Sequence, residues 1–103
     1  MHCSVWRFRG DPDALERGYR AMIERIPASN HVLHAAARTP DGLLIFDTCP
    51  SEEAYRAFFG SDEARALLAE HGLEDGVVED HPVVLAFARR TELTDESWGT
   101  AAG

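Results

Sequence analysis

The sequence predicts an α+β domain in which four strands form one antiparallel sheet and two helices cover one of its faces. Three observations lead to this expectation. Apolar residues alternate with period two near both ends of the chain, two segments show helical spacing, and a tight-turn sequence lies between them. At 103 residues the chain is long enough to build one hydrophobic core.

The first strand and the first helix are expected at the start of the chain. Residues 2–9 alternate between two faces, one of which carries Trp6. Asp11 is suited to cap a helix and Pro12 to occupy its first position. Apolar residues then recur at helical spacing as far as Pro27, which predicts an amphipathic helix.

A β-hairpin is expected in the middle of the chain. Its turn sequence is TPDG at residues 39–42, where Pro fixes φ and Asp-Gly accepts positive φ. A two-residue loop at 40–41 places His34 directly opposite Asp47, and a loop one residue later shifts the pairing by two residues but keeps both side chains on one face. A three-residue loop would separate them. The two arms are residues 30–38 and 43–49.

The second helix and the last strand complete the expected domain. Pro50 and Ser51 begin the helix, which is interrupted near residues 60–62 and stopped by Gly72. A last strand is expected over residues 77–88. The order β-α-β-β-α-β is the ferredoxin-like, split βαβ plan.

The last strand also predicts an oligomer. Both of its faces are apolar, so a sheet with one bare face would expose a large apolar patch to water. A homodimer that packs sheet face on sheet face would cover it. Residues 1–90 are therefore expected to form a dimeric α/β domain, followed by a polar tail over residues 91–103.

Composition narrows the function classes. A net charge of −8 argues against nucleic acid as a partner, since phosphate binding draws on clustered Lys and Arg. The apolar runs are too short to span a membrane and the N-terminus has no signal-peptide pattern. Two cysteines without CxxC spacing favour a reducing compartment, so a cytoplasmic location is expected. Every basic residue is Arg and Ala is abundant, which favours a bacterial source with GC-rich codons.

His34 and Asp47 are the candidate catalytic residues. In such a pair the carboxylate orients the imidazole and raises its basicity, so that the other ring nitrogen can take a proton from an activated carbon or a phenol. The alternative interpretation is a structural hydrogen bond between two strands, which needs no substrate.

Four further residues are candidates for contact with a substrate. Tyr55 and Phe58, about one turn apart, can form an aromatic wall over a planar ligand. Trp6 and His81 can line the same cavity. Each also has a structural interpretation, as a core residue or as a solvent-facing residue at a strand end.

No metal site is expected, because the histidines lack the spacing of metal-binding motifs such as HExxH. Cys49 lies just before the second helix, where a helix N-terminus can lower a thiol pKa and activate it as a nucleophile.

The run from His34 to Phe58 resembles the dimeric α/β barrel superfamily, in particular small proteins related to antibiotic-biosynthesis monooxygenases and polyketide cyclases. These relatives share a segment H-x4-T-x2-G, a strand that ends in Asp, and a helix start Trp-x-Ser. Cys49 stands where the relatives have Trp. The matching positions are His34, Thr39, Gly42, Asp47 and Ser51.

The resemblance implies a homodimeric enzyme of secondary metabolism that acts without a cofactor. Its substrate would be aromatic or polyketide-like, and its chemistry proton transfer of the cyclase or aldol type. Two alternatives stay open: a cofactor-independent monooxygenase that oxidises a phenol or quinol, and a non-catalytic ligand-binding or structural dimer. Haem-degrading members carry a Trp and an axial His where this chain has Phe58 and Leu68, so no haem is expected.

Overall fold

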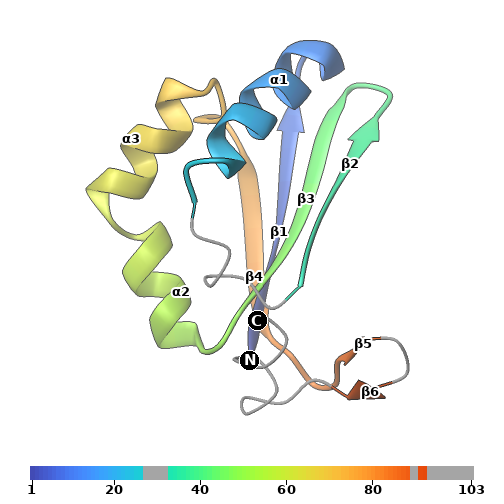
Figure 1. The fold of residues 1–103 in the computed structure, drawn as a ribbon, viewed down its shortest axis with the longest axis vertical. Coiled ribbons are helices and arrows are strands. Elements are labelled where there is room, and N and C mark those ends of the chain that lie inside the picture. Colours follow the sequence, from blue (N-terminus) through green and yellow to red (C-terminus); the bar gives the residue numbers. More distant parts are fainter. Residues whose placement is uncertain (27–32, 89–90, 93–103) are drawn as a thin grey trace.

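A computed structural model describes residues 1–26, 33–88 and 91–92 (Figure 1). The fold is α+β, with a four-stranded antiparallel sheet and three helices. The elements are β1 (His2–Arg9), α1 (Pro12–Ile23), β2 (His34–Thr39), β3 (Gly42–Cys49), α2 (Glu52–Phe59), α3 (Asp62–Glu70), β4 (Val77–Pro82), β5 (Phe87–Ala88) and β6 (Thr91–Glu92).

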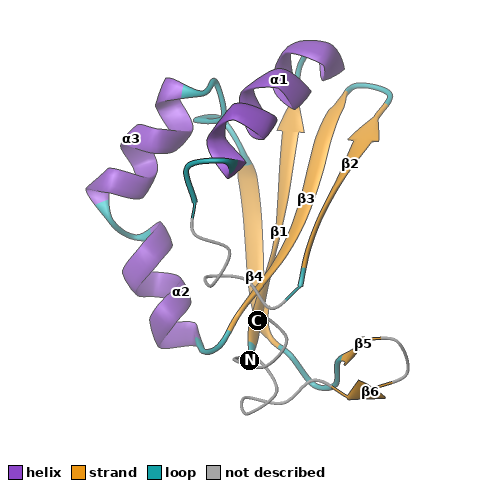
Figure 2. Ribbon diagram, viewed as in Figure 1, coloured by secondary structure: helices purple, strands orange, loops and turns teal. Residues whose placement is uncertain are grey.

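The main sheet has the strand order β2-β3-β1-β4, and β5 pairs with β6 in a separate two-stranded sheet. All neighbouring strands of the main sheet run antiparallel. The three helices lie together on one face of this sheet, and in the described part of the chain no helix covers the other face, which we call the bare face (Figure 2). This small sheet-and-helix architecture is compatible with the ferredoxin-like plan.

The hairpin has the first of the two expected registers. A two-residue turn at Pro40 and Asp41 joins β2 to β3, and Thr39 pairs with Gly42. Five residue pairs further into the ladder, His34 lies directly opposite Asp47. The two-residue turn at Pro40 and Asp41 therefore sets the register that brings the two candidate catalytic residues together.

Side-chain caps fix where the helices begin. The Asp11 carboxylate accepts from a backbone N–H of α1, Ser51 caps α2 and Ser61 caps α3. The expected interruption at residues 60–62 is complete, so the predicted second helix is two helices. α3 ends where Gly72 takes a positive φ of 74°.

The core lies between the helices and the sheet. Its buried members are Phe8, Met22, Leu43, Ile45 and Leu73. α1 comes very close to the end of α3, because a Cβ atom built on Gly18 would lie 2.2 Å from the backbone oxygen of His71. Only a residue without a side chain permits this approach.

The last strand is shorter than predicted: β4 ends at Pro82 and does not continue to residue 88. The physical reason is the length of its neighbour. β1 begins at His2, which pairs with Pro82, and the N–H of Val83 makes one more bond, to the carbonyl oxygen of Met1, so the ladder does not continue to Val84. The side chain of Val84 is consequently 99% exposed.

The first helix also ends earlier than expected, at Ile23 instead of near Pro27. Part of the predicted first hairpin arm (residues 27–32) and most of the predicted tail (residues 93–103) lie outside the described residues. None of the helices in the described part of the chain combines the length and the apolar character that a membrane crossing requires.

Candidate functional site

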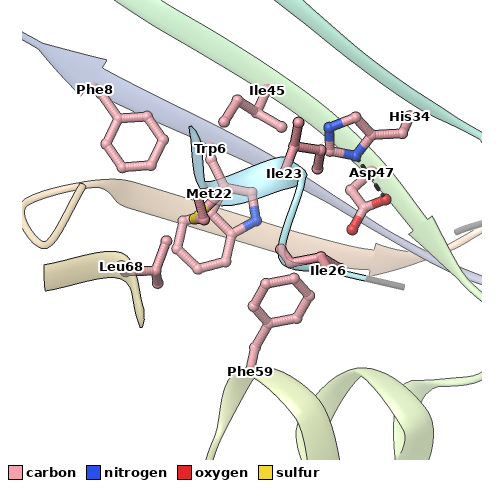
Figure 3. Close-up of a pocket in the computed structure, with 10 residues that line it drawn as sticks. All are labelled: Trp6, Phe8, Met22, Ile23, Ile26, His34, Ile45, Asp47, Phe59 and Leu68. Carbon is pink, nitrogen blue, oxygen red and sulfur yellow. Dashed lines mark hydrogen bonds and ion pairs between the residues drawn. The ribbon is translucent and has the colours of Figure 1, made fainter. Parts of the chain in front are cut away.

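The predicted pair lies on the helix-facing side of the sheet. Nδ1 of His34 is 3.2 Å from a carboxylate oxygen of Asp47 (Figure 3). Asp47 is only 2% exposed, whereas the His34 side chain is partly accessible. A carboxylate this deeply buried is stable only if polar partners compensate for the lost water, and the imidazole is one such partner.

A third residue, Tyr19, joins the pair from α1. Its hydroxyl is 2.6 Å from Nε2 of His34, and the two rings lie parallel within 2°. In the neutral imidazole, Nδ1–H donates to Asp47 while Nε2 accepts from the phenol O–H. The arrangement is a chain of hydrogen bonds that runs from the phenol through the imidazole to the buried carboxylate.

Burial raises the pKa of Tyr19 above its ordinary value, and the negative charge of Asp47 raises it further. The phenol is therefore protonated at neutral pH and acts as the hydrogen-bond donor in this chain. In the sequence, Tyr19 falls within the apolar stripe of the predicted first helix and does not stand out as a site residue. The one available signal was a tyrosine within that apolar stripe, because a buried phenol needs a polar partner.

Behind the pair is an inner cavity between sheet and helices (Figure 3). Its walls are apolar except for His34 and Asp47. Its volume of about 30 Å³ is enough for one or two water molecules. Small-molecule sites are at least ten times larger, at roughly 300–1,000 Å³. The apolar lining consists of Trp6, Phe8, Met22, Ile23, Ile26, Ile45, Phe59 and Leu68.

The predicted substrate contacts are only partly brought together here. Trp6 lines the inner cavity, and its indole N–H donates to the hydroxyl of Ser4 at 3.0 Å. On α2 the residue in the cavity wall is Phe59, and Phe58 packs edge-on against it. Tyr55 is buried elsewhere, in a polar cluster at the end of the sheet.

His81 lies on the opposite, helix-free face of the sheet. It pairs with Cys3 in the β1–β4 ladder, whereas the cavity residue Trp6 pairs with Val78. Successive residues of a strand point to opposite faces, so the odd-numbered His81 and the even-numbered Val78 face opposite ways. The exposed His81 ring is 3.4 Å from the Glu79 carboxylate, and it takes no part in the candidate site.

The cluster around Tyr55 is a second polar network. The buried His2 ring is 2.7 Å from the Asp80 carboxylate, which also receives two hydrogen bonds from Arg56 at 2.6 and 3.0 Å. Arg56, and to a lesser degree His2, hold the pKa of Asp80 below its ordinary value. The network ties α2 to β1 and β4, so we interpret it as structural.

Cys49 does not have the chemistry of an activated nucleophile. Burial, together with the charge of Asp47, raises the pKa of its thiol from 9.0 to about 11. The nearby helix start does not offset this burial, and the thiol stays protonated at neutral pH.

Among the described residues, no group of three or more His, Cys, Asp or Glu side chains is placed to hold a metal ion. No protein-family model matches this chain, and no curated protein matches its sequence.

Proposed function

We propose that the protein is a small-molecule enzyme that transfers protons without a cofactor. Its reaction would be of the cyclase or aldol type, on an aromatic or polyketide-like substrate. The observation that supports this most strongly is the chain of hydrogen bonds from Tyr19 through His34 to the buried Asp47. Such a chain can accept a proton at one end and stabilise the resulting positive charge at the other.

In this proposal His34 is the proton acceptor and Asp47 orients it. A proton that arrives at Nε2 makes the imidazole cationic. The Asp47 carboxylate is hydrogen-bonded to the other ring nitrogen. Because Asp47 is buried, water does not screen the attraction between the carboxylate and the cationic imidazole. A general base positioned in this way typically contributes about 10²- to 10⁴-fold to a rate.

The proposal includes a ferredoxin-like chain that pairs with a second copy through the bare face of the sheet. Its support is that β3 lies between β1 and β2, as in a split βαβ unit. On the bare face, a groove of about 330 Å³ has a largely apolar lining that includes Cys3, Phe46 and Leu85. A second sheet packed against this face would remove these apolar groups from water.

One observation favours a different function. Both ring nitrogens of His34 already have a hydrogen-bond partner, and the inner cavity is too small for a substrate. The same chain of hydrogen bonds would therefore also suit a non-catalytic dimer, in which it only joins α1 to the hairpin.

Isotope exchange separates the two candidates. Wild-type protein in D₂O is incubated with phenylacetone, an aromatic ketone whose CH₂ group is weakly acidic, and loss of the CH₂ signal is followed by NMR. We expect faster exchange than in buffer, and a loss of about 100-fold or more of the enzymatic rate in His34→Ala. His71→Ala, at the end of α3, is the matched control and should keep the wild-type rate.

Thermal unfolding of the same variants completes the test. A His34→Ala protein that exchanges as fast as wild type would exclude the catalytic role. Wild-type protein without any activity, combined with a lower Tm in His34→Ala, would favour the structural dimer.

A further inference from the structure

Another hollow lies outside the core, between α1 and the edge strand β2. Its volume is about 210 Å³, several times that of the inner cavity. We call it the outer groove. It is lined by Glu16, Tyr19, Arg20, Ala36, Arg38 and Leu43.

The spacing of residues on both elements builds this groove. Positions 16, 19 and 20 are neighbours on one face of α1, because they are three and four residues apart. On β2, His34, Ala36 and Arg38 face the same side, because side chains alternate along a strand. The small side chain of Ala36 leaves open the space between the two larger ones.

Tyr19 connects the outer groove with the buried pair. Its side chain lines the groove, and its hydroxyl bonds to His34, which lines the inner cavity. A molecule in the outer groove would therefore meet Tyr19 and reach His34 only through it. Because the inner cavity has room for little more than water, the outer groove is the better place for a substrate.

The groove already binds one carboxylate, that of its own Glu16. One oxygen of Glu16 accepts from Nε of Arg20 at 2.9 Å, and the other from Arg38 at 3.1 Å. These two arginines hold the pKa of Glu16 below its ordinary value. Arg38 also pairs with Asp13 at 2.8 Å. Guanidinium groups present several N–H donors in a fixed plane and are well suited to carboxylates.

We propose that the outer groove is the substrate site, and that its substrate is a small aromatic keto acid. The substrate carboxylate takes hydrogen bonds from Arg20 and Arg38, and its acidic carbon lies against the hydroxyl of Tyr19. Tyr19 is then the catalytic residue that touches the substrate, and His34 acts behind it. This inference rests on the proton-transfer function proposed above.

The proton step balances without a further reagent. The C–H bond beside the ketone breaks and its proton goes to the Tyr19 oxygen, while the original phenol proton passes to Nε2 of His34. The C–H electron pair forms the enolate, whose charge rests on the ketone oxygen. The enolate then takes a proton from water, and the hydroxide left behind receives the proton that His34 returns through Tyr19.

Phenylpyruvate is the probe, because it carries an aromatic ring, a carboxylate and an acidic CH₂ group. Its binding is followed by NMR titration, and its enolisation by the absorbance of the enol. We expect saturable binding with shifts at the amides of groove residues, and enolisation faster than in buffer. The uncharged methyl ester should bind about 10- to 100-fold more weakly, since it loses charge-assisted hydrogen bonds.

Variants then locate the site. Ala36→Trp fills the outer groove and should abolish both binding and enolisation, whereas Ala21→Trp, on the exposed side of α1, should change neither. Arg38→Gln should weaken phenylpyruvate binding about tenfold or more and leave binding of the ester unchanged. Tyr19→Phe should keep binding and lose enolisation.

The possible failures are distinguishable. Enolisation that survives in Ala36→Trp, together with unchanged phenylpyruvate binding in Arg38→Gln, would overturn the outer groove as the substrate site while the proposed function stands. Binding in the groove without any enolisation would overturn the proton-transfer function and the catalytic role of Tyr19. Absence of both binding and enolisation would overturn the keto acid as the substrate class.

Discussion

The hydroxyl of Tyr19 lies 2.6 Å from Nε2 of His34, and this bond joins the first helix to the edge strand of the sheet. The opposite ring nitrogen of His34 is 3.2 Å from Asp47 on the next strand. One imidazole thus connects α1 with both strands of the hairpin. Substitution of any of the three hydrogen-bonded residues should therefore change both the stability of the fold and the chemistry of the site.

Removal of the buried carboxylate is the first test of this view. Asp47→Ala takes away the acceptor that His34 has on β3 and should lower the free energy of unfolding by about 1–3 kcal/mol. Urea denaturation followed by circular dichroism measures the change. The control is Asp13→Ala, because Asp13 is exposed and its ion pair with Arg38 should contribute less than about 1 kcal/mol. Equal losses in the two variants would show that Asp47 has no special structural role.

The His34–Asp47 pairing could be predicted from the sequence as one of a few possible registers, because it depends on a local feature. Pro40 and Asp41 set the turn, and the alternation of a strand carries the register from there to the pair. Helix starts were predictable for the same reason, since each capping side chain accepts a hydrogen bond from a backbone N–H no more than three residues away.

The contact of Tyr19 with His34 was not predictable in this way. It depends on how α1 crosses the sheet, and that is decided by packing between segments distant in sequence. The same holds on α2, where a rotation of one residue puts Phe59 instead of Phe58 into the cavity wall. The last strand was predicted too long because alternation reports side-chain faces, whereas strand length also depends on a partner strand.

The two cysteines should differ sharply in reactivity. Cys49 is buried with a pKa of about 11, whereas Cys3 is partly exposed on the bare face of the sheet. Iodoacetamide at pH 8 should therefore modify Cys3 first, and mass spectrometry of peptides would follow both sites. Preferential modification of Cys49 in the folded protein would contradict its protonated, buried state.

The raised pKa of Cys49 also predicts a dependence of stability on pH. The folded state keeps the proton more strongly than the unfolded chain, so this contribution is complete below pH 9 and is lost as the pH rises toward about 11. Unfolding midpoints in urea across this range measure the loss. Cys49→Ala should show a flatter profile above pH 9, and an unchanged profile would contradict the assignment.

Gly18 should tolerate no side chain, although it lies within a helix. Gly→Ala in a helix is ordinarily stabilising by about 1 kcal/mol. Here the new Cβ would lie 2.2 Å from the backbone oxygen of His71, so α1 or the end of α3 must move. We expect Gly18→Ala to lower the Tm, and Gly72→Ala to do so by strain at its positive φ. A higher Tm in Gly18→Ala would show that the two helices separate easily.

The bare face of the sheet provides the test of assembly. Phe46 lies on this face between Val5 and Ala35, and Val77 at its edge is 71% exposed. If two copies pack through it, Phe46→Glu would bury a charge without a partner at the centre of the interface, which disfavours association strongly. Size-exclusion chromatography with light scattering should give the mass of two chains for wild type and of one chain for Phe46→Glu.

The control for this experiment is Ala57→Glu, which adds the same charge on an exposed position of α2 and should remain dimeric. A dimer that persists in Phe46→Glu would place the interface elsewhere on the surface. A wild-type monomer would instead mean that the chain itself tolerates the apolar face in water. In that case a hydrophobic dye should bind the apolar face around the half-buried side chain of Phe46, and Phe46→Glu should reduce the fluorescence of the dye.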